Sequence, residues 1–138
     1  AEKAFLGPFF PVTLLDRVRV VENDGFSGPV VSVAAMGIAA MTVGADLVLI
    51  ERGQRSAALL QHELVHACQI RELGQEAFGR AYADQYVDSG YSYGGIPFEQ
   101  QAFTFTGLPI PAVGTPPLIS TFAVGSPPAV PPMYLSCN

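Results

Sequence analysis

"AALLQHELVHACQIRELG" spans residues 57–74 and holds both histidines of this 138-residue chain, His62 and His66. Ser56 precedes the stretch as a suitable N-cap, and Gly74 follows its last apolar residue as a suitable stop. Apolar residues and histidines recur inside it at steps of three and four residues, at positions 59, 62, 66, 70 and 73. The stretch therefore predicts an amphipathic helix that presents both imidazoles on one face.

The HELVH segment of this helix, residues 62–66, has the spacing of a zinc site. Side chains four residues apart lie one above the other on a helix, so both imidazoles can bind one ion at about 2.0–2.1 Å. Glu63 follows the first histidine directly, which places its carboxylate beside the metal rather than on it. From there it can take a proton from a zinc-bound water and pass it to a leaving amine. The segment predicts zinc-dependent peptide hydrolysis with Glu63 as the catalytic base; two histidines without a metal are the alternative.

A catalytic zinc ion needs a third protein ligand and an open position for water. Glu72, six residues after His66, turns away from the histidine face of the helix. Glu99 is the predicted ligand, because it follows a Gly-Gly-x-Pro turn and the small Ala102 lets its helix pack closely. The alternative is that Glu99 only interacts with the N-terminus of its own helix. Three further acids lie on an intervening helix and are expected on its solvated side: Glu76, Asp84 and Asp88.

Tyrosines and a glutamine near these ligands are candidates for supporting roles. Tyr91 or Tyr93, in the loop before Pro97, can donate a phenol hydroxyl to a tetrahedral oxyanion, and Tyr93 is the predicted catalytic residue. A loop tyrosine that anchors the turn by its ring is the alternative. Gln69 stands three residues after His66 on the same helical side, where it either supports a metal ligand or faces solvent.

The N-terminal part of the chain, residues 1–54, has the composition of strands. A β-branched run at 17–22 predicts one strand, followed by a turn at 23–25. The segment 41–51 predicts a second strand that continues around a glycine. We expect two strands and a short helix in this region, paired as a small antiparallel sheet.

Two more helices are predicted after the histidine helix. The first runs from Gln75 to about Ser89, with aromatic residues facing the core at positions 78, 82 and 86. The second is short and begins at Pro97, a residue well suited to the first position of a helix.

Residues 107–138 differ from the rest of the chain. They contain eight of its twelve prolines and no charged side chain. Pairs of prolines prevent a helix and weaken a central strand, so this segment is expected to be extended. Because disordered tails are normally polar and this one is rich in apolar residues, we expect it to dock on the domain of residues 1–106 or on a partner.

The two cysteines, Cys68 and Cys137, allow one disulfide. Cys68 points away from the metal because it lies two residues beyond His66 on the helix, so it is not a predicted ligand. A disulfide is the favoured interpretation, and two unrelated thiols are the alternative.

The composition excludes some classes of function. With a net charge of −5 and seven Lys and Arg, the chain has no basic stripe to bind nucleic acid. Its longest nearly uncharged run, residues 28–45, falls short of the roughly 20 apolar residues that span a bilayer. The first residue, Ala1, suits cleavage after an export signal, so a periplasmic or extracellular location is expected.

Several segments together resemble the bacterial metallopeptidase-like domain that accompanies extracellular contractile injection systems, a minimal gluzincin. The similar segments are LLDRVRV, AMTVGADLVLI, LLQHELVHACQ, ELGQEAFGRAYADQY and GYSYGGIPFEQQAF, within residues 12–105. The resemblance implies a compact α+β fold, His62 and His66 as zinc ligands, Glu63 as the catalytic acid, and Glu99, in a Pro-x-Glu-x-x-Ala motif, as third ligand. The chain departs from the family at Gln101, where a second Glu is frequent, and in its proline-rich tail.

Two functions follow as hypotheses for an α+β domain whose small sheet packs on the zinc helix and one or two further helices. In the first, the chain is a zinc metallopeptidase that acts on a peptide or protein. In the second, it is a non-catalytic subunit derived from a metallopeptidase and docked in a larger assembly through residues 107–138. The intact Glu63 favours the enzyme, whereas the low charge and the apolar tail favour the subunit.

Overall fold

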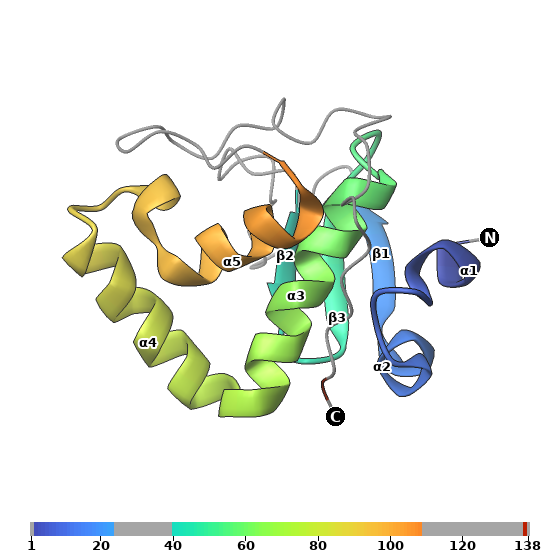
Figure 1. The fold of residues 1–138 in the computed structure, drawn as a ribbon, viewed down its shortest axis with the longest axis horizontal. Helices are drawn as coiled ribbons and strands as arrows, with labels where there is room; N and C mark the ends of the chain where they lie inside the picture. The colour runs from blue at the N-terminus through green and yellow to red at the C-terminus, as the bar shows by residue number, and fades with distance from the viewer. Residues whose placement is uncertain (1, 24–39, 109–136, 138) are drawn as a thin grey trace.

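The computed structural model describes residues 2–23, 40–108 and 137. Figure 1 shows a long central helix, α3 (Ala57–Leu73), in front of a small sheet. Two short helices lie on one side of α3, and two longer helices lie on the other. These flanking helices are α1 (Glu2–Leu6), α2 (Val12–Arg17), α4 (Gln75–Asp88) and α5 (Pro97–Thr106). The fold is therefore α+β, as predicted.

The sheet is mixed, which corrects the antiparallel sheet expected from the sequence. Its strands lie in the order β1-β3-β2. Val48 of β3 is opposite Thr42 in the antiparallel pair with β2, and opposite Val20 in the parallel pair with β1. The strand bounds are β1 (Arg19–Asn23), β2 (Ala40–Val43) and β3 (Leu47–Glu51).

The segment 41–51 forms a hairpin rather than the single strand expected. Gly44 has a φ of 66°, a left-handed conformation that glycine adopts easily, and the chain reverses there. Parallel pairing of β1 with β3 needs a long connection, which residues 24–39 and β2 supply. The turn expected at 23–25 and most of the apolar run 28–45 lie outside the described residues.

The central helix begins and ends where predicted but is not amphipathic. The side chain of Ser56 accepts a hydrogen bond from the Leu59 N–H at 3.1 Å, and Gly74 ends the helix with a φ of 84°. Every side chain from 58 to 70 is buried. A helix buried on all sides has no solvated face, so its polar residues need partners inside the protein.

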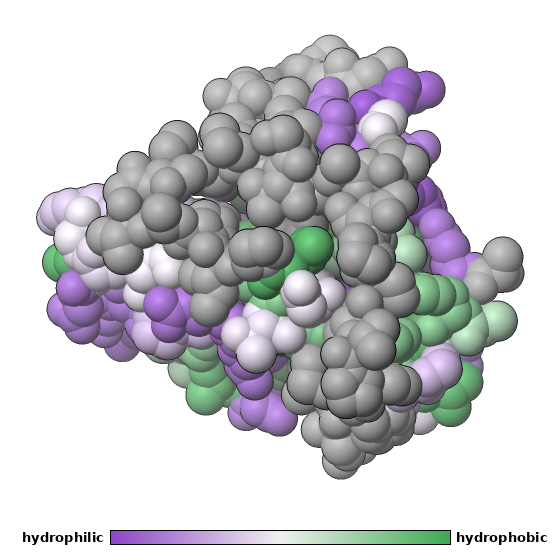
Figure 2. Space-filling view, turned by 45° about the horizontal axis from the view of Figure 1, so that its top comes forward, coloured by the Kyte–Doolittle hydropathy of each residue, from purple (hydrophilic) through white to green (hydrophobic). Residues whose placement is uncertain are grey.

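The helix α4 packs much more loosely and contains no buried residue. Hydrophilic surface prevails on the side of the molecule where it lies (Figure 2). The predicted aromatic stripe packs only in part: Phe78 stacks on Phe98 of α5 with ring centroids 4.9 Å apart, whereas Tyr86 is 41% exposed. Contacts of α4 with α5 therefore come from a few side chains.

The chain after α5 is described at two places. Gly107 ends α5 in the left-handed region, with a φ of 71°, and Leu108 packs against the core. Cys137 is buried and belongs to the core cluster. The expected extended arm falls on residues 109–136, which lie outside the described residues. In the described ranges, no helix has the length and apolar character needed to cross a membrane.

Candidate metal site

The helix α3 brings the imidazoles of His62 and His66 together. Their Nε2 atoms lie 3.2 Å apart, and their rings meet edge to face with centroids 4.9 Å apart. The ring of Phe103 on α5 packs edge-on against His62, at 4.6 Å between centroids. The two histidines are only 1% and 6% exposed, so packing fixes the direction in which both rings point.

Glu99 meets this pair from the first turn of α5. Its Oε2 lies 2.9 Å from Nε2 of His62 and 3.1 Å from Nε2 of His66. Pro97 begins the helix, and the fully buried Ala102 leaves room for α5 to approach α3. The proline that starts the helix and the small Ala102, which favoured Glu99 in the sequence, thus place the first turn of α5 against α3.

The other acids considered lie elsewhere. Glu76 forms an exposed ion pair with Arg80 on α4, at 2.8 Å. The remaining three are exposed: Glu72, Asp84 and Asp88.

The ligand atoms of His62, His66 and Glu99 are close enough to hold a metal ion, all within 4.8 Å of one another. Tetrahedral zinc with bonds of about 2.0–2.1 Å separates neighbouring ligand atoms by about 3.3–3.4 Å. The three separations here are 2.9, 3.1 and 3.2 Å, so a small outward movement of the side chains fits the ion. Two imidazoles and a carboxylate are also a donor set that zinc accepts.

The charges of these residues are strongly coupled. Burial lowers the pKa of His66, but the charge of Glu99 and its hydrogen bond, with the charge of Glu63, raise that pKa overall to about 9. Burial raises the pKa of Glu99, but the charge and hydrogen bonds of the two histidines hold it well below its ordinary value. A proton on His66 therefore balances the Glu99 carboxylate, and a bound cation would replace that proton.

Two phenol hydroxyls complete the surroundings of Glu99. Tyr82 of α4 donates to Oε1 at 2.8 Å, and Tyr93 donates to Oε2 at 2.9 Å. Burial and the charge of Glu99 raise the pKa of both phenols, so both remain protonated donors. Tyr93 was predicted to serve an oxyanion, and its hydroxyl contacts the carboxylate of the third candidate ligand. Tyr91 is 67% exposed and packs against the ring of Tyr86 instead.

The loop between α4 and α5 places Tyr93 in the short 3-10 helix Tyr93–Gly95. A Cβ atom on Gly95 would lie 2.8 Å from the Cβ of Ser89, so the loop can close this tightly only with glycine there. The Ser89 hydroxyl accepts a hydrogen bond from the Ser92 N–H at 3.0 Å, which holds the two ends of the loop together.

Gln69 lies inside the site rather than in solvent. Its Oε1 is 2.8 Å from Nδ1 of His66. Its Nε2 donates to the backbone O of Phe98 at 3.2 Å and to Oε1 of Gln101 at 2.8 Å. The amide therefore links α3 to the first turns of α5.

Glu63 is buried beside the histidines and held by the sheet. The Thr42 hydroxyl on β2 is 2.6 Å from Oε2 of Glu63 and 3.0 Å from its backbone O. The charge of Glu63 helps to raise the pKa of His66 and the pKa of both phenols. The predicted base thus lies within electrostatic reach of the site.

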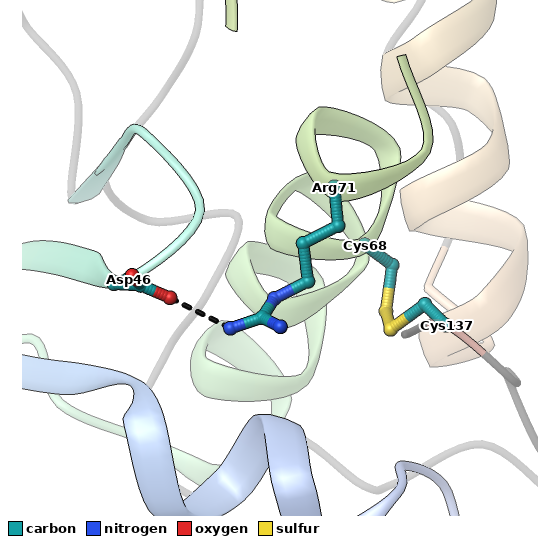
Figure 3. Close-up of a disulfide and its surroundings, with 4 residues drawn as sticks. All are labelled: Asp46, Cys68, Arg71 and Cys137. Carbon is teal, nitrogen blue, oxygen red and sulfur yellow. Dashed lines mark hydrogen bonds and ion pairs between the residues drawn. A yellow bond between two sulfur atoms is a disulfide. The ribbon is translucent and has the colours of Figure 1, made fainter. Parts of the chain in front are cut away.

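The two cysteines form the disulfide that the sequence favoured, with Cα atoms 5.4 Å apart. Figure 3 shows Cys68 and Arg71 leaving α3 on different sides, the first toward Cys137 and the second toward the turn between β2 and β3. Arg71 forms an ion pair with Asp46 in that turn at 2.6 Å. The sulfur of Cys68 is engaged in this bond and is not among the clustered ligand atoms of His62, His66 and Glu99.

Sequence reasoning missed three residues around the site: Thr42, Tyr82 and Gln101. Tyr82 was interpreted as part of a core stripe, and its hydroxyl was the available signal, since a partly buried phenol needs a partner. Thr42 gave no signal of its own, and Gln101 stood out only as a departure from the family pattern, because their contacts depend on how the sheet and α5 pack on α3.

Comparison with known proteins identifies the N-terminal half. A protein-family model described as the eCIS core domain matches residues 2–74, more than half of the chain. The match runs from α1 to the end of α3 and includes His62, Glu63 and His66, whereas Glu99 lies beyond it. No curated protein and no solved structure matches the chain significantly. The contribution of α4 and α5 to the site therefore rests on geometry.

Proposed function

This chain belongs to the eCIS core domain family, and we propose that it serves as a metal-stabilised structural subunit of an extracellular contractile injection system. Family membership supports a place in a larger protein assembly. The cluster of His62, His66 and Glu99 supports a bound metal ion, and the HExxH spacing of residues 62–66 favours zinc among the metals that such donors bind.

The burial of the site is the observation that carries this proposal. Structural zinc sites are closed, whereas catalytic ones keep a position open for water and substrate. Both histidines, Glu63 and Glu99 are buried, and phenol hydroxyls contact both oxygens of Glu99. This burial favours a site that a peptide chain does not enter, and a closed structural site would need a fourth donor beside His62, His66 and Glu99.

A bound ion would cross-link α3 and α5. The histidines lie 37 and 33 residues before Glu99, and the chain between them includes the loosely packed α4. The ion would supply positive charge among buried donors, and it would stabilise the folded state because the unfolded chain has no preformed site. The metal would thus hold this half of the domain in one shape.

Metal analysis and thermal unfolding of the purified chain test the proposal. We expect one zinc ion per chain after dialysis, and a lower Tm after chelation. Glu99→Ala should weaken zinc binding by orders of magnitude, because only two protein ligands remain. The matched control is Glu76→Ala, which removes an exposed acid of α4 and should leave zinc binding unchanged. Wild-type protein without stoichiometric zinc would contradict the proposal.

Peptide hydrolysis of the gluzincin type is the second candidate, and Glu63 is the observation that favours it. The carboxylate lies beside the candidate ligands, where a general base would be needed, and Thr42 holds it there. Tyr93 would have to leave Glu99 to reach an oxyanion. Glu63→Gln should keep the zinc and abolish any peptidase activity of the wild type. Equal turnover by wild type and variant would exclude this role of Glu63.

The disulfide supports the proposed location outside the cytoplasm. Such bonds persist in the periplasm and in extracellular space and are rare in the cytosol. We propose that the chain acts in one of these oxidising compartments. Free-thiol titration of protein purified from its native source would test this: two free thiols per chain would contradict the location.

Residues 107–138 are the proposed contact with the assembly. This uncharged segment carries many apolar side chains that are unfavourable in water. Replacing Leu118, Ile119 and Phe122 together by Ser should release the chain from its complex without removing zinc. A variant that still co-purifies with the complex would contradict this contact.

A further inference from the structure

We infer that Gln69 is a positioning residue that fixes the ring of His66 with Nε2 directed at the metal, and that Gln101 steadies Gln69 in this role. The inference rests on the proposed metal site and adds the residues that orient one of its ligands. Histidine ligands commonly donate their second ring N–H to a fixed acceptor, and losing that acceptor weakens metal binding.

The backbone O of Phe98 determines which way the Gln69 amide faces. A carbonyl oxygen can only accept, so the atom 3.2 Å from it must be the NH₂ group of Gln69. The contact with Gln101, at 2.8 Å, joins two amides. By itself it would allow the O and N atoms of the Gln69 amide to be exchanged, provided that those of Gln101 were exchanged as well. The backbone contact removes this ambiguity and leaves Oε1 of Gln69 facing His66.

The protonation of the His66 ring follows from this orientation. Oε1 of Gln69 is an acceptor, and it lies 2.8 Å from Nδ1, so Nδ1 must carry the hydrogen. In the neutral imidazole the lone pair is then on Nε2, the atom that faces Nε2 of His62 and Oε2 of Glu99. Gln69 therefore selects the tautomer that a metal ion at this place needs.

The Gln69 amide that makes this hydrogen bond to His66 is buried and held in place. Gln69 is 5% exposed, and all of its polar atoms have protein partners. Because those partners come from both α3 and α5, the amide is held from two sides. Gln101 is exposed and supplies only one of the two acceptors for the NH₂ group, so its effect should be the smaller.

Three substitutions separate positioning from packing, with competition against a calibrated chelator as the measure of zinc affinity. Gln69→Leu keeps the volume and removes the acceptor, and should weaken zinc binding about 10- to 100-fold. Gln69→Glu keeps an acceptor oxygen for His66 but loses the donor to the backbone O of Phe98, so it should lose less zinc affinity than Gln69→Leu without matching wild type. Gln61→Leu is the matched control: it is an equally buried glutamine on α3 whose amide has no hydrogen-bond partner in the described part of the chain.

The exchange rate of the His66 Nδ1 hydrogen with solvent is a second measurement, and a change in packing alone would not alter it. In nitrogen-15 NMR of full-length protein, with and without zinc, this proton should exchange slowly in wild type and Gln61→Leu, and rapidly in Gln69→Leu. Circular dichroism would confirm that each variant is folded. If Gln69→Leu does not fold, Gln101→Leu replaces it, and its zinc affinity should lie below that of wild type by less than about tenfold.

The outcomes distinguish this inference from the proposed function. Wild-type protein that binds no zinc overturns the metal site and the inference with it. Wild-type protein that binds zinc, with Gln69→Leu of equal affinity, overturns the inference alone. A folded Gln69→Leu protein whose His66 Nδ1–H still exchanges slowly also overturns it, because the acceptor would then not be what holds the ring.

Discussion

Tyr82 on α4 donates a hydrogen bond of 2.8 Å to Glu99 on α5, although α4 has no buried residue of its own. This bond reaches the carboxylate oxygen that does not face the histidines. It therefore connects α4, which has no buried residue, to a buried carboxylate. The hydroxyl both orients Glu99 and ties α4 to the rest of the fold.

Tyr82→Phe tests the strength of this connection. Hydrogen bonds to charged groups contribute about 1.5–3 kcal/mol, so the free energy of unfolding should fall by about that amount. Zinc affinity should fall as well, because one oxygen of Glu99 loses its donor. Tyr86→Phe is the control on the same helix, since Tyr86 is exposed, and it should change neither quantity. Chemical denaturation and chelator competition measure the two effects.

The stability of metal-free and zinc-bound protein should depend on pH in opposite directions. In the metal-free protein the pKa of His66 is raised to about 9, against about 6.5 in the unfolded chain. The protonated form of His66 therefore contributes its full stabilisation below about pH 6.5, and this contribution is lost as the pH rises through 9. The depressed pKa of Glu99 adds stability above its unfolded pKa, about 4.5, that is lost as pH falls. Metal-free protein should therefore have its highest Tm near pH 5–6.

Zinc binding must displace the proton from His66, so the affinity should rise about tenfold for each pH unit up to about pH 9. Calorimetry in buffers of different ionisation enthalpy would count the released protons, and we expect about one near pH 7.5. Thermal scans of both forms across pH 5–9 give the two trends. A Tm that rises in both forms between pH 6.5 and 9 would contradict this assignment of the proton.

The parts of the site that lie close together in sequence were predictable. Four-residue spacing on a capped helix settles the place of His62 relative to His66 without any knowledge of the rest of the fold. Glu99 could be selected because a proline-started helix and a small Ala102 are local signals of close helix packing. Each of these predictions needed only one element or its immediate flank.

Features that depend on how elements pack were missed. The sheet was expected to be antiparallel, but the parallel pairing of β1 with β3 follows from the path of the chain between them. The central helix was expected to be amphipathic, but elements from both ends of the chain bury it on all sides. Its polar residues are therefore buried, a point that periodicity could not reveal.

Gln61 shows a cost of burying α3 on all sides. Its side chain is fully buried, and neither amide atom has a partner within the described ranges. Leaving buried polar groups unsatisfied costs about 1–3 kcal/mol, so Gln61→Leu should raise the free energy of unfolding by about that much. Denaturant unfolding would measure the change, with Gln69→Leu as the opposite case, since it removes a satisfied amide. A destabilised Gln61→Leu protein would mean that the amide has a partner.

The disulfide between Cys68 and Cys137 should stabilise the fold without contributing to the metal site. It closes a loop of the chain between residues 69 positions apart, for which chain entropy gives about 4 kcal/mol. Cys68→Ala combined with Cys137→Ala removes the bond and leaves no unpaired thiol. We expect the double variant to lose about 2–4 kcal/mol of stability, measured by denaturant unfolding of the metal-free form.

Zinc affinity of the same double variant separates the two contributions. Cys68 lies between His66 and Gln69 in sequence, but its sulfur leaves α3 toward Cys137 and is not among the ligand atoms. Because α3 is held by the sheet and α5 as well, its residues near the site should stay in place when the bond is lost. The affinity should thus remain within about threefold of wild type, a change of less than 1 kcal/mol. A loss of tenfold or more would show that the disulfide is needed to hold the ligands in position.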